Sequence, residues 1–321
     1  MKKAIKIWLI IAAALMLAGF ILLGGVMAMI KWDFTKLSTT KYETREYNIT
    51  ESFENISVMT KTADVVFVPA EGTECRVVCY EQTDAAHTVA VREGVLTIEW
   101  TDTRGWMAHI GFNFQTPKIT VYMPAGAYDS LTVKSSTGGV SIPSEFGFES
   151  VDISLTTGFV TCKASVLSSL SVKTSTGAIT LQDVSAGSLD LTVTTGKVTA
   201  TNVACAGDIS IKVNTGKSIL TDVTCQDLIT TGSTGDITLK NVIAAGKFSI
   251  ERSTGDVTLD ACDAAEISVT TDTGDVTGTL LTDKTFFVET DTGRREYPHM
   301  TTGGKCEITT DTGDIKISIK K

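Results

Sequence analysis

Several residue types are scarce in this sequence, and each scarcity narrows what the chain can be. Only three histidines and five prolines occur among 321 residues, and aromatic residues make up 7%. No histidine accompanies any pair of cysteines, so the sequence predicts no zinc site. The short alternating apolar runs lack a 3.6-residue period, which excludes a helical solenoid. An apolar content of 42% with abundant glycine instead suits a folded domain of many short strands.

The sequence also has fewer basic than acidic residues. The formal net charge is −9, and four of the basic residues lie in or beside the first apolar stretch, before any acid occurs. The chain from Asp33 onward is therefore still more acidic than the net charge suggests. Such a surface repels nucleic acid, which we exclude as the main partner.

Long hydrophobic runs are absent except for one near the N-terminus. The run of residues from Ile7 to Ile30 contains no charge, and it is long enough to span a hydrocarbon core of ~30 Å. Trp8 and Trp32 stand at its two ends, where amphipathic rings favour the interface. Three basic residues precede it: Lys2, Lys3 and Lys6. We therefore expect a single pass through the cell membrane, with a cytoplasmic N-terminus and an extracytoplasmic remainder.

A cleaved signal peptide is the alternative, with Val26-Met27-Ala28 as a passable cleavage site. The apolar run exceeds the roughly 7–15 residues usual in a signal sequence, which favours an uncleaved anchor over residues 1–32. No cysteine lies near the end of the run, so a lipoprotein anchor is excluded. Polar residues without periodicity follow and predict a linker over residues 33–45.

A Thr-Gly pair recurs every 19 or 20 residues through the rest of the chain. Ten glycines, each preceded by threonine, carry this period: Gly138, Gly158, Gly177, Gly196, Gly216, Gly235, Gly255, Gly274, Gly293 and Gly313. Apolar residues recur seven and five residues before these glycines and two after them, with Thr230, Ser218 and Arg295 as the exceptions. This alternation means that one strand enters a corner and another leaves it, and glycine permits the sharp bend. The threonine shares the parity of the inward positions, so we expect a threonine ladder lining each corner from within.

One repeat unit cannot bury its apolar face alone, but stacked units can. The fold class is therefore all-β: a single-stranded parallel β-helix, or β-solenoid, of about ten coils of 19–20 residues over residues 131–321. Looser strand-like runs over residues 46–130, with a hairpin at Arg92-Glu93-Gly94, predict an atypical β N-terminal cap. At the other end, Ile315–Ile319 should close the stack, with Lys320 and Lys321 discouraging edge pairing.

The run Ile119–Tyr128, leading into Leu131–Gly138, resembles the bacterial β-strand-repeat ectodomain family catalogued as putative adhesins. The segment Lys305–Ile317 and the repeated Thr-Gly-Asp-Val/Ile show the same likeness. The resemblance covers about residues 46–321 and implies a right-handed parallel β-helix-like fold in the cell envelope. That family has no agreed catalytic motif, so the resemblance implies no catalytic or cofactor-binding residues.

The repeat register also places most of the seven cysteines. They fall in slots that other coils fill with small apolar residues, which predicts burial as apolar side chains. Cys205 and Cys225 would stack in adjacent coils, so a disulfide between them stays open. Cys75 and Cys79 would lie on one face of a strand, too far apart for easy bridging.

Aspartates flank the corners in the C-terminal half of the repeat. Asp236, Asp256, Asp275 and Asp314 follow the glycine, while Asp272, Asp291 and Asp311 precede the threonine. Stacked carboxylates could hold calcium, but aspartate also suits solvent-facing turns, and the Gly-Gly-x-Gly-x-Asp pattern is missing. The sequence favours the turn role. It leaves only weak calcium candidates, namely Asp256, Asp272, Asp275, Asp291, Asp311 and Asp314, and no other cofactor.

One coil breaks the pattern, because Arg295 replaces an apolar residue. Asp291, Arg294, Glu296 and His299 could form a small catalytic cluster there, but an irregular turn at Pro298 explains the departure as well, so no catalytic residue is predicted. The aromatic-rich stretch from Trp100 to Phe114 is either a partner-binding patch or packing over the solenoid end.

Taken together, the sequence predicts a membrane-anchored extracytoplasmic solenoid that acts as a non-catalytic binding or adhesin-like envelope protein. A cell-wall polymer or another envelope protein would be its partner. The alternatives are a carbohydrate-active enzyme on the same scaffold and a calcium-stiffened structural spacer.

Overall fold

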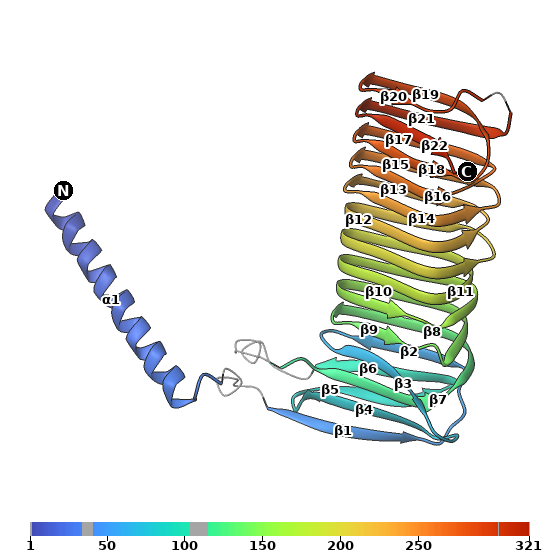
Figure 1. Cartoon of the computed structure of the whole chain (residues 1–321). Helices are drawn as coiled ribbons and strands as arrows, with labels where there is room; N and C mark the ends of the chain where they lie inside the picture. The colour runs from blue at the N-terminus through green and yellow to red at the C-terminus, as the bar shows by residue number, and fades with distance from the viewer. Residues whose placement is uncertain (1, 34–40, 103–114, 301, 321) are drawn as a thin grey trace.

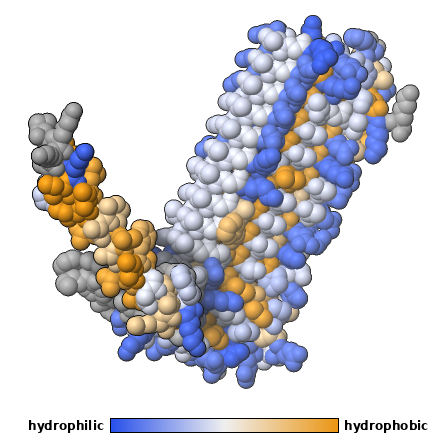
Figure 2. Space-filling view, turned by 60° about the vertical axis from the view of Figure 1, so that its left-hand side comes forward, coloured by the Kyte–Doolittle hydropathy of each residue, from blue (hydrophilic) through white to orange (hydrophobic). Residues whose placement is uncertain are grey.

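The computed structural model describes residues 2–33, 41–102, 115–300 and 302–320. Its described part contains one helix, α1 (Lys2–Met29), and strands joined in one hydrogen-bonded sheet (Figure 1). Over Ile5–Met29 the helix is long and apolar enough to cross a membrane, a test that signal sequences also pass. Nearly all its described side chains are exposed, Trp8 by 70% (Figure 2).

The strands alternate along the chain with short corners. Their bounds are β1 (Tyr42–Ile49), β2 (Asn55–Thr60), β3 (Asp64–Ala70), β4 (Cys75–Gln82), β5 (Ala85–Arg92), β6 (Val95–Asp102), β7 (Lys118–Pro124), β8 (Gly126–Thr137), β9 (Val140–Ile142), β10 (Phe146–Cys162), β11 (Ser165–Cys205), β12 (Ile209–Cys225), β13 (Leu228–Thr234), β14 (Ile237–Ala244), β15 (Lys247–Thr254), β16 (Val257–Cys262), β17 (Glu266–Thr273), β18 (Val276–Leu280), β19 (Lys284–Thr292), β20 (Arg295–Glu296), β21 (Gly304–Thr312) and β22 (Ile315–Ile319).

Neighbouring coils pair in parallel, with corner glycine beside corner glycine. Gly158 pairs with Gly177, and Gly196 pairs with Gly216. In the coil of Gly196, buried residues form three inward runs, listed here as Leu189, Leu191, Val193; Val198, Ala200; Val203 and Cys205. The runs of all coils merge into one continuous core. The predicted all-β solenoid of about ten turns is thus confirmed (Figure 1).

Both conformation and space require glycine at the Thr-Gly corner. Gly216 has φ 137°, and a Cβ there would lie 1.7 Å from the carbonyl oxygen of Gly196. The neighbouring threonines do form a ladder, since Thr195 pairs with Thr215. However, they are exposed, and the last inward residue is Val213. The prediction of an inward ladder was wrong, because the chain already turns between Val213 and Thr215.

A second corner lies six residues after the glycine and uses asparagine and aspartate. Asp183, Asn202, Asp222 and Asn241 have φ of 56°, 53°, 55° and 51°, a conformation that Asn and Asp tolerate better than other side chains. The amide Nδ2 of Asn202 donates to Asp183 Oδ1 at 2.7 Å, and Asn241 does the same to Asp222. Amides therefore alternate with carboxylates along this row, which keeps like charges apart.

The coils do not stack in chain order at the C-terminal end. Strand β21 pairs with β17 on one side and β19 on the other, while β22 lies between β18 and β20. The last coil of the chain is therefore the second coil from the end in space. The expectation that Ile315–Ile319 closes the stack was wrong; β19 and β20 do so.

The coils at the N-terminal end of the solenoid are also stacked out of chain order. Strand β2 lies between β6 and β8, and β3 lies between β7 and β9, all in parallel pairs. Antiparallel strands then cover this end: β4 pairs with β7, β1 with β4, and β5 with β6.

Two expectations about this end are settled by its strands. The predicted hairpin at Arg92-Glu93-Gly94 is confirmed, with positive φ at both Glu93 and Gly94. The predicted linker (33–45) is corrected at its end, because β1 begins at Tyr42 and its backbone pairs with β4. Residues 34–40 of that linker and residues 103–114 of the aromatic stretch lie outside the described residues.

One buried arginine interrupts the apolar core. Arg252 is 3% exposed; its Nη1 donates to the Val213 carbonyl oxygen at 2.5 Å, and its Nη2 lies 3.4 Å from Ser218 Oγ. Its Nε and the Thr230 hydroxyl have no hydrogen-bond partner. In the adjacent coil, Gly232 leaves room, since a Cβ there would lie 1.8 Å from Arg252 Nη1.

All seven cysteines are buried and unpaired, which confirms the predicted burial of those in the repeat coils. Burial raises the pKa of most of their thiols, for Cys306 to about 12. The stacked pair Cys205 and Cys225 is likewise unbonded.

Candidate functional site

The aspartates that follow the corner glycines form one row along the solenoid. In order of stacking, the row contains Lys197, Lys217, Asp236, Asp256, Asp275, Asp314 and Arg294. Each carboxylate accepts the backbone N–H of the next residue in the row. For example, Asp256 Oδ1 accepts from Asp275 N at 2.9 Å, and Asp275 Oδ1 from Asp314 N at 2.7 Å. The row thus helps to hold one coil on the next.

Cations stand at both ends of the four aspartates. Lys217 Nζ lies 2.9 Å from Asp236 Oδ2, and its hydrogen bond is the main cause of the lowered pKa of Asp236. The Arg294 backbone N–H and guanidinium lower the pKa of Asp314. Calcium takes six to eight oxygens, whereas each of these carboxylates already uses Oδ1 to bind the next coil. The geometry therefore favours a structural role for Asp256, Asp275 and Asp314.

The other three calcium candidates lie on a neighbouring exposed row. Because of the exchanged coils, Asp311 stands between Asp272 and Asp291. The structure therefore brings the six candidates into two adjacent rows on the outer surface, not into one cage.

The pattern-breaking coil does not assemble the polar cluster considered from the sequence. Arg294 pairs with Asp314, and Glu296 pairs with Lys316 at 2.9 Å. The His299 ring lies 5.0 Å from the Tyr297 ring. Asp291 is exposed, so these acids, the arginine and the histidine do not converge.

A buried polar cluster lies instead in the N-terminal cap. It consists of Cys79 and Glu81 on β4 and His87 on β5, and we call it the Glu81 cluster. Inward residues alternate along β4, so Cys79 and Glu81 share a face. A tight turn after β4 then brings β5 back, which places His87 beside Glu81. Their exposed fractions are 0%, 1% and 3%.

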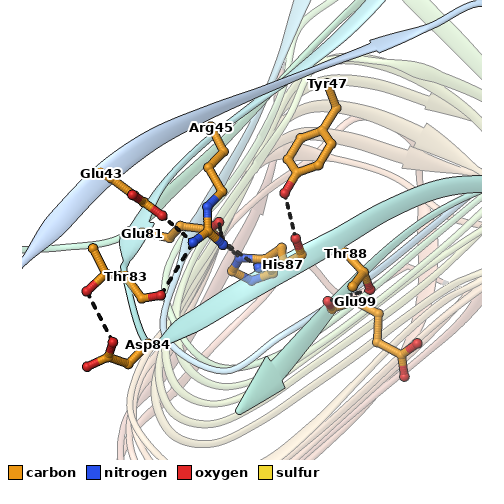
Figure 3. Close-up of polar contacts among 9 residues, drawn as sticks. All are labelled: Glu43, Arg45, Tyr47, Glu81, Thr83, Asp84, His87, Thr88 and Glu99. Carbon is orange, nitrogen blue, oxygen red and sulfur yellow. Dashed lines mark hydrogen bonds and ion pairs between the residues drawn. The ribbon is translucent and has the colours of Figure 1, made fainter. Parts of the chain in front are cut away.

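Glu81 is held from several sides (Figure 3). Its Oε2 accepts the backbone N–H of His87 at 2.7 Å and lies 2.6 Å from His87 Nδ1. Its Oε1 lies 3.3 Å from Arg45 Nη1, and Arg45 also forms an ion pair with Glu43. The other ring nitrogen, His87 Nε2, lies 2.8 Å from Thr60 Oγ1. These bonds explain how a carboxylate can be buried here, since buried charge requires partners.

Cys79 completes the cluster. One ligand atom from each of Cys79, Glu81 and His87 lies within 4.8 Å of the others. Burial, with the nearby Glu81 charge, raises the pKa of the Cys79 thiol to about 12. The thiol is therefore protonated in the metal-free chain and is not a nucleophile at neutral pH.

A cavity of about 340 Å³ adjoins the cluster. Its lining includes Glu81, His87, Lys61, Trp100 and Gln115. The Lys61 ammonium lies 4.9 Å from the Trp100 ring, within cation–π range. Glu81 and His87 thus connect the buried cluster with an open volume.

The sequence argument missed this cluster because it searched for histidine beside pairs of cysteines. A usable signal was present in the alternation of Cys75, Val77, Cys79 and Glu81, which places a carboxylate at a buried position of the strand. The closeness of His87 depends on the turn that follows.

Comparison with known proteins supplies a family. Residues 53–318 match the model of a family described as Toastrack DUF4097. A solved structure described as a "putative adhesin" from Parabacteroides merdae is 11% identical, with a TM-score of 0.48 over 88% of this chain and 98% of that one. A "putative lipid binding protein" from Parabacteroides distasonis is 14% identical, with a TM-score of 0.46 over 88% and 98%. No curated protein matches the chain.

Proposed function

The chain belongs to the Toastrack DUF4097 family, and on that premise we propose that it is a membrane-anchored, extracytoplasmic, non-catalytic binding protein of the cell envelope. Residues 1–32 would be the anchor and residues 46–130 the cap of the solenoid. Family membership supports the scaffold and not a particular ligand, because function depends on sites and not on folds.

The observation that carries this proposal is the repetition of exposed side chains along the solenoid. The threonine before each corner glycine is exposed in every coil, and Thr195, Thr215 and Thr234 pair in succession. Figure 2 shows one flank as an even, pale surface along its length. Coils repeat at a strand spacing of ~4.8 Å. A polymer with a repeating unit can therefore contact many equivalent hydroxyls, and weak contacts add.

Charge narrows the class of polymer. The net charge is −9, and acidic rows flank the C-terminal half of the threonine row. Like charge disfavours association, so the partner would be a neutral or cationic glycan of the cell wall and not an anionic one.

The binding surface can be tested by sedimentation. Full-length chain in detergent micelles would be incubated with insoluble wall glycans and spun down. The double variant Thr195→Glu/Thr215→Glu places two charges in the threonine row and should reduce retention at least tenfold. The matched control Ala204→Glu/Thr224→Glu places two charges on another face of the same coils and should bind like the wild type. Failure of every glycan to retain the wild type, or equal losses in both variants, would reject the proposal.

The same incubation also addresses the enzymatic alternative. The dispersal of Arg294, Glu296 and His299 supports a non-catalytic role. We expect no soluble fragments from any glycan. Fragments that disappear in Glu296→Gln or Asp291→Asn would favour a carbohydrate-active enzyme.

The anchor can be tested by alkaline carbonate extraction of membranes. The uncovered apolar surface of α1 supports a membrane span. If the span is uncleaved, as proposed, the chain should stay in the pellet with its full mass. Accessibility of the solenoid to protease added outside intact cells would support the proposed orientation. A soluble chain shortened after about residue 28 would instead indicate a cleaved signal sequence.

A further inference from the structure

We propose that the Glu81 cluster is a binding site for one zinc-class divalent cation, held by Cys79 Sγ, a Glu81 carboxylate oxygen and His87 Nδ1. Within the described part of the chain, this is the one group of three or more His, Cys, Asp or Glu residues whose ligand atoms converge, and they do so within 4.8 Å. All three side chains are buried.

The donor set matches zinc chemistry. Sulfur, imidazole nitrogen and carboxylate oxygen are the ligands that zinc takes, at about 2.3, 2.0–2.1 and 2.0–2.2 Å. Three protein ligands leave the fourth tetrahedral position open, as in non-structural zinc sites. Glu81 and His87 line the 340 Å³ cavity, so a water molecule or a ligand atom from that cavity would complete the coordination.

Surrounding groups orient two of the three ligands, His87 and Glu81. Thr60 Oγ1 lies 2.8 Å from His87 Nε2 and can accept a hydrogen bond from an Nε2–H, which leaves Nδ1 free to bind the metal. Arg45 holds Glu81 Oε1, leaving Oε2 on the side of His87. Partners of this kind are typical of zinc ligands. The ion pair of Arg45 with Glu43 also neutralises the arginine, so the charge of the cation is balanced by the thiolate and the carboxylate.

Metal binding must displace protons and requires a small movement. The thiol proton of Cys79 would leave to solvent as one cation enters. The proton between His87 Nδ1 and Glu81 Oε2 would move to Nε2, or to solvent where Nε2 already carries a proton. These two ring and carboxylate atoms are 2.6 Å apart in the metal-free chain. They must separate to about 3.3 Å to share a tetrahedral zinc. Rotation of one side chain is sufficient for a shift of this size.

The site would fasten the N-terminal end of the solenoid. It links β4 to β5, and Arg45 and Thr60 extend its contacts to β1 and β2. Ligation would therefore stabilise the strands that cover the first coil.

The test uses the full-length chain in detergent micelles, freed of metal by a chelator that is then removed. Zinc is titrated by calorimetry, and Co²⁺ is used as a spectroscopic probe. We expect one zinc per chain and a near-ultraviolet thiolate-to-cobalt charge-transfer band. Cys79→Ser should abolish the band and weaken zinc binding at least tenfold. Thr60→Val should weaken it by about 10–100-fold.

Cys75→Ser is the matched control, because Cys75 lies on the same strand and inward face but outside the cluster. It should keep the charge-transfer band and the affinity. Thermal unfolding of each metal-free variant shows whether it is folded. Absence of a cobalt–thiolate band in the wild type, or equal losses in Cys75→Ser and Cys79→Ser, would overturn the proposal.

Discussion

The buried guanidinium of Arg252 and the missing side chain of Gly232 should behave as a single packing unit. In other coils the equivalent slot holds a buried residue such as Val213 or Thr271. Here Arg252 Nη1 occupies the space over Gly232 and donates to the Val213 carbonyl oxygen at 2.5 Å. We therefore predict that Gly232→Val and Arg252→Thr are each destabilising alone and partly compensate each other in combination.

The magnitudes follow from packing and hydrogen bonding. Gly232→Val alone places its Cβ 1.8 Å from Arg252 Nη1 and 1.9 Å from the Val213 carbonyl oxygen. It should cost at least the ~1–3 kcal/mol that is typical of overpacking. Arg252→Thr alone removes a charged hydrogen bond of about 1.5–3 kcal/mol and leaves a void beside Gly232, partly offset by release of a buried charge. Together they restore the valine and threonine that other coils carry and remove the unpartnered Nε. The added Cβ still lies 1.9 Å from the Val213 carbonyl oxygen, so the backbone must shift even in the double variant. We expect the double variant to be less stable than the wild type but about 1–3 kcal/mol more stable than the sum of the two single effects.

Amide hydrogen exchange over residues 228–259 would measure these free energies, because long repeat arrays need not unfold in one step. Thr174→Val is the control, since it occupies the equivalent slot several coils away. Combined with Arg252→Thr it should be additive, as expected for distant sites. Additive effects for Gly232→Val and Arg252→Thr would refute the packing unit.

Four further predictions concern the corners and the charged rows. Gly216→Ala should destabilise by more than about 3 kcal/mol through its positive φ and its collision with Gly196 of the preceding coil. Gly139→Ala, whose Cβ meets nothing closer than 3.4 Å, should be nearly neutral. Amide hydrogen exchange of both variants checks this, and equal effects would contradict it. Asn202→Asp should cost about 1–2 kcal/mol by stacking carboxylates, while Asp183→Asn should cost less than about 0.5 kcal/mol in the same assay and high salt should narrow the difference. Because the folded-state pKa of Asp236 is lowered, the stabilisation by its carboxylate is present above the unfolded pKa of about 3.9 and is lost as pH falls through the folded pKa. In thermal melts, Asp236→Asn should therefore be less stable than the wild type at pH 7 but not at pH 2. A difference that persists at pH 2 would contradict this. Since the corner carboxylates already bind backbone N–H groups, adding millimolar calcium to the metal-free chain should leave its melting temperature unchanged, and a rise of several degrees would show that calcium is bound.

The residues inside each coil were predictable because apolar residues recur at fixed distances from the corner glycine. A two-residue alternation on both sides of a required glycine leaves one inward set, so the burial of Leu189, Leu191 and Val198 follows from the sequence. The direction of Thr195 was not predictable in the same way. Alternation holds along a straight strand, but it breaks within β11, where Thr194 and Thr195 are both exposed.

The cap and its cluster depend on contacts that the repeat does not encode. The alternation along β4 could have identified Glu81 as a buried carboxylate. Its partners Arg45 and His87 come from antiparallel neighbours whose pairing has no periodic signal. Similarly, Asp183 and Asn202 lie at the same place in successive coils, but only the positive φ reveals why those residue types occur there.

The exchange of the last two coils has a physical reason in the pattern-breaking residue itself. The slot two residues after the corner glycine is buried in the inner coils, as Val276 and Ile315 show. The coil of β19 and β20 has Arg295 in that slot, and a charged side chain sandwiched between two coils would lose its hydration without a partner. At the end of the stack Arg295 is exposed. The coil of β21 and β22 carries Ile315 and Ile317 and can be covered on both sides, so it takes the inner position. The residue that the sequence offered as a sign of chemistry is therefore explained by the end of the solenoid, where an apolar slot is no longer needed.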